Sequence, residues 1–213
     1  MRDATELESR GAIGYAADGV PDALLVLAHG AGAGQRHPFM TGVARGMARR
    51  GIDTVTFDFP YIRQGRRVPD RAPQLEEAFA DAVGAARRWS RASGLFIGGK
   101  SMGGRMATHL GAAGLEGLRG IVVFGYPLHP PGKPEQPRVR HLPSIRAPVL
   151  IVQGERDAFG TPQELGPVIE TMAAPVSLHV VPGADHSLTV RSRPKEQVLD
   201  EVLDAVGEWL RRA

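Results

Sequence analysis

The sequence predicts an α/β protein built as a three-layer sandwich, with a mostly parallel, twisted sheet between helices on both faces. Short runs of Val, Ile, Leu and Phe alternate along the chain with longer segments of helical periodicity. The runs are apolar throughout, which is typical of strands buried on both faces of a parallel sheet. The 213 residues suit one domain of this class, and no change of composition marks a second one. We therefore expect residues 1–213 to form a single domain.

Six apolar runs are the predicted strands. The first, Ala23–Ala28 (ALLVLA), ends at His29-Gly30, where the chain becomes rich in glycine. The others follow in chain order at Asp53–Phe59, Leu95–Gly98, Gly120–Gly125, Val149–Gln153 and Val176–Val181. Each run is four to seven residues long, which favours a strand over a helix.

Five segments repeat apolar residues at helical spacing. They are Met40–Arg50, Leu75–Ala92, Met102–Ala113, Thr161–Met172 and Lys195–Arg212. Gly51 fits as the stop of the first helix, and Pro162 is acceptable in the first turn of the fourth. Residues 127–148 fit neither pattern, since they hold seven prolines and little periodicity. We predict that this segment runs as an extended loop over the sheet edge.

The composition excludes several classes of protein. Apolar residues make up 42% and charged residues 23% of the chain, an ordinary globular balance. There is no cysteine, so neither a disulfide framework nor a thiolate metal site is possible. The polar N-terminus, MRDATELESRG, lacks the apolar core of a signal peptide, and no apolar run approaches a membrane helix in length. We therefore expect a cytoplasmic protein with no membrane partner.

The charge of the chain is close to balanced. The formal net charge is only +3, although the sequence pI is about 9.7. Nucleic-acid binding needs basic residues gathered on one face, so we expect no nucleic-acid partner. One stretch does hold several arginines: Arg63, Arg66, Arg67 and Arg71. A solvated surface loop is its simplest interpretation, and attraction of an anionic substrate is the alternative.

Residues 94–104, GLFIGGKSMGG, match two active-site patterns at once. Gly94, four residues and GKS spell G-x-x-x-x-G-K-S, the phosphate-binding P-loop. Residues 99–103 spell G-x-S-x-G, the turn that presents a nucleophilic serine. A P-loop follows its strand, but here the only nearby apolar run lies inside the supposed loop. The order strand, turn, helix fits the second pattern, so we predict that Ser101 is a nucleophile.

A serine hydroxyl is a poor nucleophile unless a base removes its proton and an acid orients that base. Asp157 follows the strand that ends at Gln153, and His186 follows the next strand. Alone, the first would be a turn aspartate and the second a surface histidine. Together, in the order serine, acid, histidine and after successive strands, they predict a catalytic triad.

Other residues compete for the same roles. Glu155 is one turn position too early to replace Asp157, and Asp185 adjoins the histidine too closely to face its ring easily. Lys100 beside the serine suggests a Ser-Lys pair. Adjacent residues on a sharp turn point apart, so we expect Lys100 to be a passenger in the turn.

The oxyanion formed during acyl transfer needs two N–H donors. The N–H of Met102 follows the nucleophile and is the first predicted donor. The second should come from the small residues after His29, where we choose the Ala31 N–H; a glycine-rich turn without this role is the alternative. We expect His29 to brace that loop. The predicted apolar walls of a shallow acyl pocket, each of which could equally belong to the core, are Phe39, Met40, Tyr126 and Phe159.

Four stretches carry a resemblance to a known family: LAHGAGAG, GKSMGGR, VQGERDAFG and GADHS. On these the chain resembles the α/β-hydrolase superfamily over nearly its whole length, from Leu24 to the final helix. It is most similar to the small lidless members grouped with dienelactone hydrolase, and among them to a subgroup that includes testis-expressed and chromatin-complex eukaryotic relatives. The resemblance implies Ser101 as nucleophile, Asp157 as acid and His186 as base. It also implies that no cap domain is present, because residues 127–148 stand where a lid would be.

The predicted function is hydrolysis of a small-molecule carboxylic ester or thioester through an acyl-enzyme. No metal and no organic cofactor are required by this chemistry. Three alternatives remain: a binding or scaffold protein with little turnover, a nucleotide-binding protein that uses Gly94–Ser101, and acyl transfer to an acceptor other than water. The sequence carries no prediction of the oligomeric state.

Overall fold

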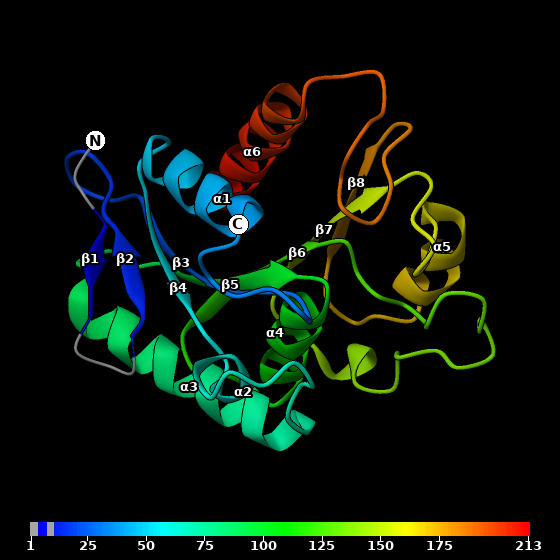
Figure 1. The fold of residues 1–213 in the computed structure, drawn as a ribbon, viewed down its shortest axis with the longest axis horizontal. Coiled ribbons are helices and arrows are strands. Elements are labelled where there is room, and N and C mark those ends of the chain that lie inside the picture. Colours follow the sequence, from blue (N-terminus) through cyan, green and yellow to red (C-terminus); the bar gives the residue numbers. More distant parts are fainter. Residues whose placement is uncertain (1–3, 8–10) are drawn as a thin grey trace.

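A computed structural model describes residues 4–7 and 11–213 of the chain. Residues 1–3 and 8–10, part of the stretch from which we predict that no signal peptide is present, lie outside the described residues. An eight-stranded sheet lies between two layers of helices, as Figure 1 shows. This arrangement confirms the predicted fold class. A bilayer-spanning helix is not found among residues 4–7 and 11–213.

The sheet is parallel except at its N-terminal edge. The strands are β1 (Thr5–Glu6), β2 (Ile13–Tyr15), β3 (Ala23–Ala28), β4 (Ile52–Phe57), β5 (Leu95–Lys100), β6 (Leu118–Phe124), β7 (Val149–Gly154) and β8 (Val176–Val181). They lie in the order β1-β2-β4-β3-β5-β6-β7-β8, and only the β1–β2 and β2–β4 pairs are antiparallel. We did not predict β1 and β2, because strands of two and three residues are too short to show a period.

Helices cover both faces of the sheet. On one face lie α1 (Pro38–Ala48) and α6 (Lys195–Arg212), and on the other lie α3 (Ala72–Trp89), α4 (Met102–Ala112) and α5 (Pro162–Glu170). Each predicted helix forms, with ends that differ by a few residues, as helix ends commonly do. Two short elements, α2 (Pro60–Arg63) and the 3-10 turn η1 (Leu142–Ser144), have too few residues to show periodicity and were not predicted.

The proline-rich segment 127–148 connects β6 to β7, which are interior strands of the sheet. Its apolar residues Leu128, Leu142 and Ile145 are buried in the same core cluster as α3 and α4. Residues 127–148 therefore form a loop, as predicted, but one that packs into the core instead of only running over the sheet edge. These side chains anchor the segment against the helical layer, because apolar groups spaced along an irregular chain can still be buried.

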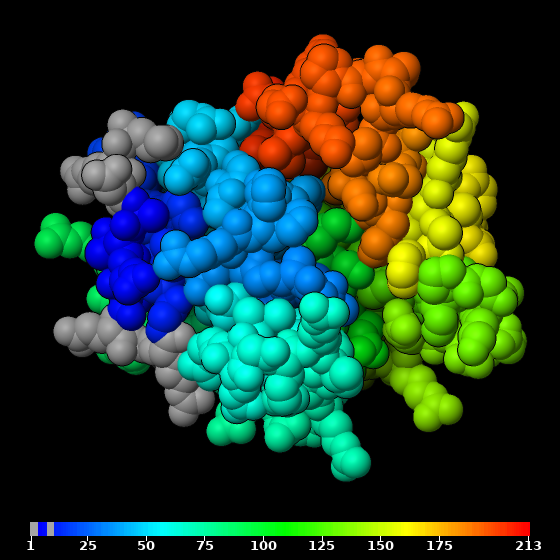
Figure 2. All heavy atoms as spheres, in the orientation of Figure 1, coloured from blue at the N-terminus to red at the C-terminus, as the bar shows by residue number. Residues whose placement is uncertain are grey.

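The carboxyl ends of the parallel strands meet at one edge of the sheet. The loops that follow β3, β5, β7 and β8 carry Ala31, Ser101, Asp157 and His186 respectively. Figure 2 shows a hollow in this face of the molecule, where green atoms of the β5–α4 region lie behind blue, cyan and orange segments. The sheet thus brings the predicted site residues to a single region.

Candidate active site

Ser101 lies on a sharp turn between strand and helix. β5 ends at Lys100, and α4 begins directly after the serine. The backbone of Ser101 has φ +51° and ψ −115°, a conformation that is costly for a residue with a side chain. Gly99 and Gly103 allow the turn, because a Cβ on either would clash with the carbonyl oxygen of Ala28. Since a strand occupies residues 95–100, the P-loop interpretation of this stretch is wrong.

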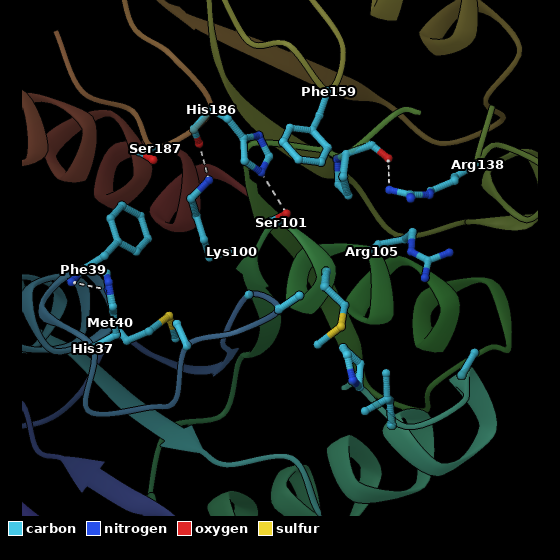
Figure 3. Close-up of a pocket in the computed structure, with 18 of the residues that line it drawn as sticks. His37, Phe39, Met40, Lys100, Ser101, Arg105, Arg138, Phe159, His186 and Ser187 are labelled. Atoms are coloured by element: carbon cyan, nitrogen blue, oxygen red, sulfur yellow. Dashed lines mark hydrogen bonds between the residues drawn. The ribbon is translucent and has the colours of Figure 1, made fainter. Parts of the chain in front are cut away.

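Ser101, His186 and Asp157 form one hydrogen-bonded chain. The Nε2 atom of His186 lies 2.8 Å from Ser101 Oγ (Figure 3). The Nδ1 atom of His186 lies 2.7 Å from Asp157 Oδ2. A carboxylate can only accept, so Nδ1 carries the proton and Nε2 is left to accept from the serine hydroxyl. The ring of Phe159 packs on the imidazole with 4.2 Å between ring centroids. The arrangement can therefore move a proton from a serine hydroxyl to an oriented imidazole.

The carboxylate of Asp157 is completely buried and accepts three hydrogen bonds. Beyond the bond from His186, Oδ2 accepts from Gln153 Nε2 at 2.9 Å and Oδ1 accepts from the Phe159 N–H at 2.8 Å. Gln153 is itself fully buried, and its Oε1 accepts from the Tyr126 N–H at 2.7 Å. Gln153 is a positioning residue that we did not predict, although a buried amide at the end of the apolar run VLIVQ was a visible signal.

The two competing acids do not face the imidazole. Glu155 accepts a hydrogen bond from the Gly183 N–H at 2.7 Å. Asp185 accepts from the N–H groups of Ser187 and Thr189, at 2.9 and 3.1 Å. Both acids therefore hold backbone turns, which agrees with the order of preference predicted for the acid.

The loop after β3 is held by a buried histidine. His29 is fully buried, and its Nε2 accepts from the Phe59 N–H at 3.1 Å while Nδ1 lies 2.8 Å from the carbonyl oxygen of Gly30. Burial lowers the pKa of His29, although the bond to Gly30 and the charge of Asp58 oppose this. The ring is therefore neutral and braces the loop, as expected. The same loop carries Ala31 to the edge of the cavity described next.

A cavity of about 520 Å³ opens in front of Ser101. Of the predicted walls, Phe39, Met40 and Phe159 line it, as do the predicted oxyanion donors of the β3 and α4 segments. The N–H groups of the first helical turn have no acceptor inside their own helix, so the N–H of Met102, the first residue of α4, can donate to a substrate oxygen. The prediction is wrong for Tyr126, which does not line this cavity. Its side chain is fully buried in the core, where its hydroxyl donates to the Arg138 carbonyl oxygen.

A family model described as "Alpha/beta hydrolase domain" matches residues 21–211. The chain belongs to this alpha/beta hydrolase family.

Solved structures share the fold of this alpha/beta hydrolase over nearly its whole length. Dienelactone hydrolase from Anabaena variabilis is 18% identical, with a TM-score of 0.77 over 99% of this chain and 97% of that one. TT1662 from Thermus thermophilus is 23% identical, with a TM-score of 0.76 over 99% of both chains. XC6422 from Xanthomonas campestris, described as a serine hydrolase without lid, is 19% identical, with a TM-score of 0.76 over 99% and 94%.

In this alpha/beta hydrolase Lys100 makes a specific contact, although we expected it to have no role in the turn. Its Nζ donates a hydrogen bond to the backbone carbonyl oxygen of His186 (Figure 3). Burial lowers the pKa of Lys100 to about 8, although the charges of Asp157 and Asp185 oppose this shift. The lysine therefore ties the strand before the serine to the loop that carries the imidazole. Sequence spacing could not show this, since the two residues are 86 positions apart.

Replacing Lys100 with methionine is expected to remove a pH dependence of stability. The pKa of Lys100 is about 8 in the folded protein and 10.5 as its ordinary value, so the unfolded chain binds more protons between these two values. Stability contributed by this site therefore rises with pH across that window. Urea unfolding near pH 8 and near pH 10 measures the gain, which should be larger in the wild type than in Lys100→Met.

Lys100→Arg is the matched control, because a guanidinium stays charged and should also lack the gain. An equal rise of the unfolding free energy in the wild type and in Lys100→Met would contradict the prediction.

The cavity is also lined by polar side chains that we did not predict as site residues. These residues are His37, Asp70, Arg105, Arg138 and Ser187. Among the residues that the structure describes, no group of three or more His, Asp or Glu side chains could hold a metal ion.

Proposed function

We propose that this alpha/beta hydrolase cleaves a carboxylic ester or thioester through an acyl-enzyme on Ser101. Membership of the family supports a hydrolase. The proposal of an acyl-enzyme on Ser101 rests on the hydrogen bonds that join Ser101 Oγ to His186 and His186 to Asp157. A hydroxyl bonded to an oriented imidazole is suited to acyl transfer at a carbonyl carbon.

The proposed reaction begins when Ser101 Oγ attacks the substrate carbonyl carbon and passes its proton to His186 Nε2. The N–H groups of Met102 and Ala31 stabilise the resulting oxyanion, and the N-terminus of α4 adds a favourable potential. The proton on Nε2 then moves to the leaving alcohol or thiol, and the acyl group remains on the serine. Asp157 keeps the imidazole in the right orientation and stabilises its positive charge.

Water completes the proposed cycle. His186 Nε2 removes a proton from a water molecule, whose oxygen attacks the acyl carbon. As the acyl–oxygen bond breaks, His186 returns this proton to Ser101 Oγ, which releases the carboxylic acid and the free serine. An acceptor other than water would give acyl transfer by the same steps. The cytoplasmic location, the absence of a nucleic-acid partner, the missing lid and the likeness to testis-expressed and chromatin-complex relatives stay predictions from the sequence.

A fluorophosphonate probe is expected to label the native protein at Ser101, because such probes phosphonylate serines activated by a neighbouring base. Intact mass measures the adduct, and peptide mapping assigns it to a residue. Ser101→Ala should not be labelled, and His186→Ala should be labelled far more slowly. The proposal would be overturned by an unlabelled native protein or by equal labelling of Ser101→Ala. Labelling without turnover of any ester or thioester would favour the scaffold alternative.

A further inference from the structure

We infer that Arg105 and Arg138 form an oxyanion-binding subsite, which selects ester substrates that carry a carboxylate or phosphoryl group. This inference rests on the proposed function and specifies its substrate class. Both arginines line the cavity that contains Ser101 and His186, and Figure 3 shows them on the same side of the serine.

Arg105 lies one helical turn after the serine. Its backbone N–H donates to the carbonyl oxygen of Ser101, the N-cap residue of α4, at 2.9 Å. Figure 3 shows the Arg105 guanidinium extending from α4 away from Ser101, toward the side of the cavity where Arg138 lies. Side chains at this spacing start only about 5–6 Å apart. An anion bound between Arg105 and Arg138 would therefore occupy the same cavity as Ser101, to one side of the serine.

The guanidinium of Arg105 has no hydrogen-bond acceptor and no ion-pair partner within the described part of the chain. Burial lowers the pKa of Arg105, and the like charge of Arg138 lowers it further, while Tyr126 and Glu76 act in the opposite direction. The carboxylate of Glu76 lies 2.8 Å from His109 Nδ1 instead. A half-buried cation without a counter-ion is unfavourable, and a bound anion would relieve that cost.

Arg138 is held in place by its backbone. Its carbonyl oxygen accepts from the Tyr126 hydroxyl at 2.6 Å, and its N–H donates to the Leu128 carbonyl oxygen at 2.8 Å. One side-chain nitrogen, Nη1, donates to the Pro127 carbonyl oxygen at 3.3 Å. The remaining N–H groups have no carboxylate partner among the described residues. Planar guanidinium forks match the paired oxygens of carboxylate and phosphoryl groups, so two such forks suit an oxyanion.

Asp70, an acid that lines the cavity, does not neutralise these cations. Asp70 Oδ1 lies 2.5 Å from Arg66 Nη2, and Asp70 Oδ2 accepts from the Tyr61 N–H at 3.0 Å. Because Arg66 pairs with Asp70, this arginine of the basic stretch that we considered for anion attraction already has a carboxylate partner. Arg105 and Arg138 therefore both bring to the cavity a positive charge that has no carboxylate partner among the described residues.

Matched substrates test the subsite through kcat/KM. On the acyl side, a succinate half-ester is compared with its methyl-capped diester, which has nearly the same shape without the charge. On the alcohol side, an acetyl ester of glycerol phosphate is compared with acetylglycerol. We expect the native protein to prefer at least one charged member of these pairs by about 10- to 100-fold, the range of charge-assisted hydrogen bonds. The favoured pair shows whether the anion is an acyl-side carboxylate or an alcohol-side phosphoryl group.

Arg105→Met and Arg138→Met should each reduce this preference, and the double variant should bring it close to one. Arg105→Lys should give an intermediate value, because lysine keeps the charge but not the fork. Arg140→Met is the matched control, since Arg140 is exposed on the same segment and does not line the cavity. A native protein that hydrolyses neutral and charged esters equally, or an Arg105→Met variant with the native preference, would overturn the subsite but not the hydrolase.

Thermal unfolding with succinate or inorganic phosphate tests the subsite without turnover. A bound anion should raise the Tm of the native protein in a saturable way, and less so for the double arginine variant. If no ester is cleaved and no serine is labelled, this difference still decides whether the subsite exists. Equal shifts for the native and double-variant proteins would overturn it.

Discussion

Replacing Ser101 with glycine is expected to abolish turnover and at the same time to stabilise the fold. The backbone of Ser101 has φ +51° and ψ −115°. Such a conformation costs a residue with a side chain about 1–3 kcal/mol, and glycine adopts it without that strain. The greater chain entropy that glycine loses on folding offsets about 0.5–1 kcal/mol. We therefore expect a net gain of about 1 kcal/mol in the free energy of unfolding.

Turnover should fall by about 10⁵- to 10⁶-fold in Ser101→Gly, because no nucleophile is left to form the acyl-enzyme. Ser101→Ala is the matched control: it should be equally inactive, but it keeps the Cβ and so should not gain stability. Urea unfolding and ester progress curves measure the two effects. Identical unfolding midpoints for the glycine and alanine variants would show that the turn is unstrained, and near-native turnover of Ser101→Ala would exclude it as nucleophile.

Replacing Asp157 with asparagine is expected to lower kcat by about 10⁴-fold. Three donors converge on the buried carboxylate: Gln153 Nε2, the Phe159 N–H and His186 Nδ1. An amide group has only one acceptor oxygen, so its NH₂ group must face at least one of these donors. If the NH₂ faces the imidazole, Nδ1 becomes the acceptor and Nε2 carries the proton. The ring can then no longer accept the proton of Ser101.

Asp185→Asn is the matched control for this change. Asp185 Oδ1 accepts from two backbone N–H groups, and an amide oxygen can do the same. We expect it to retain most of the native kcat, with thermal unfolding confirming that both variants are folded. If Asp157→Asn loses less than about tenfold, or if Asp185→Asn loses as much, Asp157 is not the acid that orients His186.

The strands and helices of the sandwich could be predicted because each carries its own pattern. The run ALLVLA is β3 without change, and the alternation of apolar runs with amphipathic segments predicts the remaining core strands and helices. Where the pattern is short or irregular, the prediction fails. β1 has only two residues. In residues 127–148 the prolines interrupt any period, so the burial of Leu142 and Ile145 could not be predicted. Leu142 and Ile145 are buried by contacts with residues that are distant in the sequence, so the local pattern does not indicate their burial.

The sharp turn at Ser101 could be predicted from the sequence alone, because the strand, the glycines and the helix start are contiguous in the chain. The predicted partners Asp157 and His186 follow from the same logic, since the carboxyl ends of parallel strands share one edge. Only the tertiary structure decided which polar groups surround them. It places Lys100 on the His186 carbonyl and brings Arg105 and Arg138 into one cavity. Periodicity orients side chains within an element, whereas contacts between distant elements depend on how those elements pack.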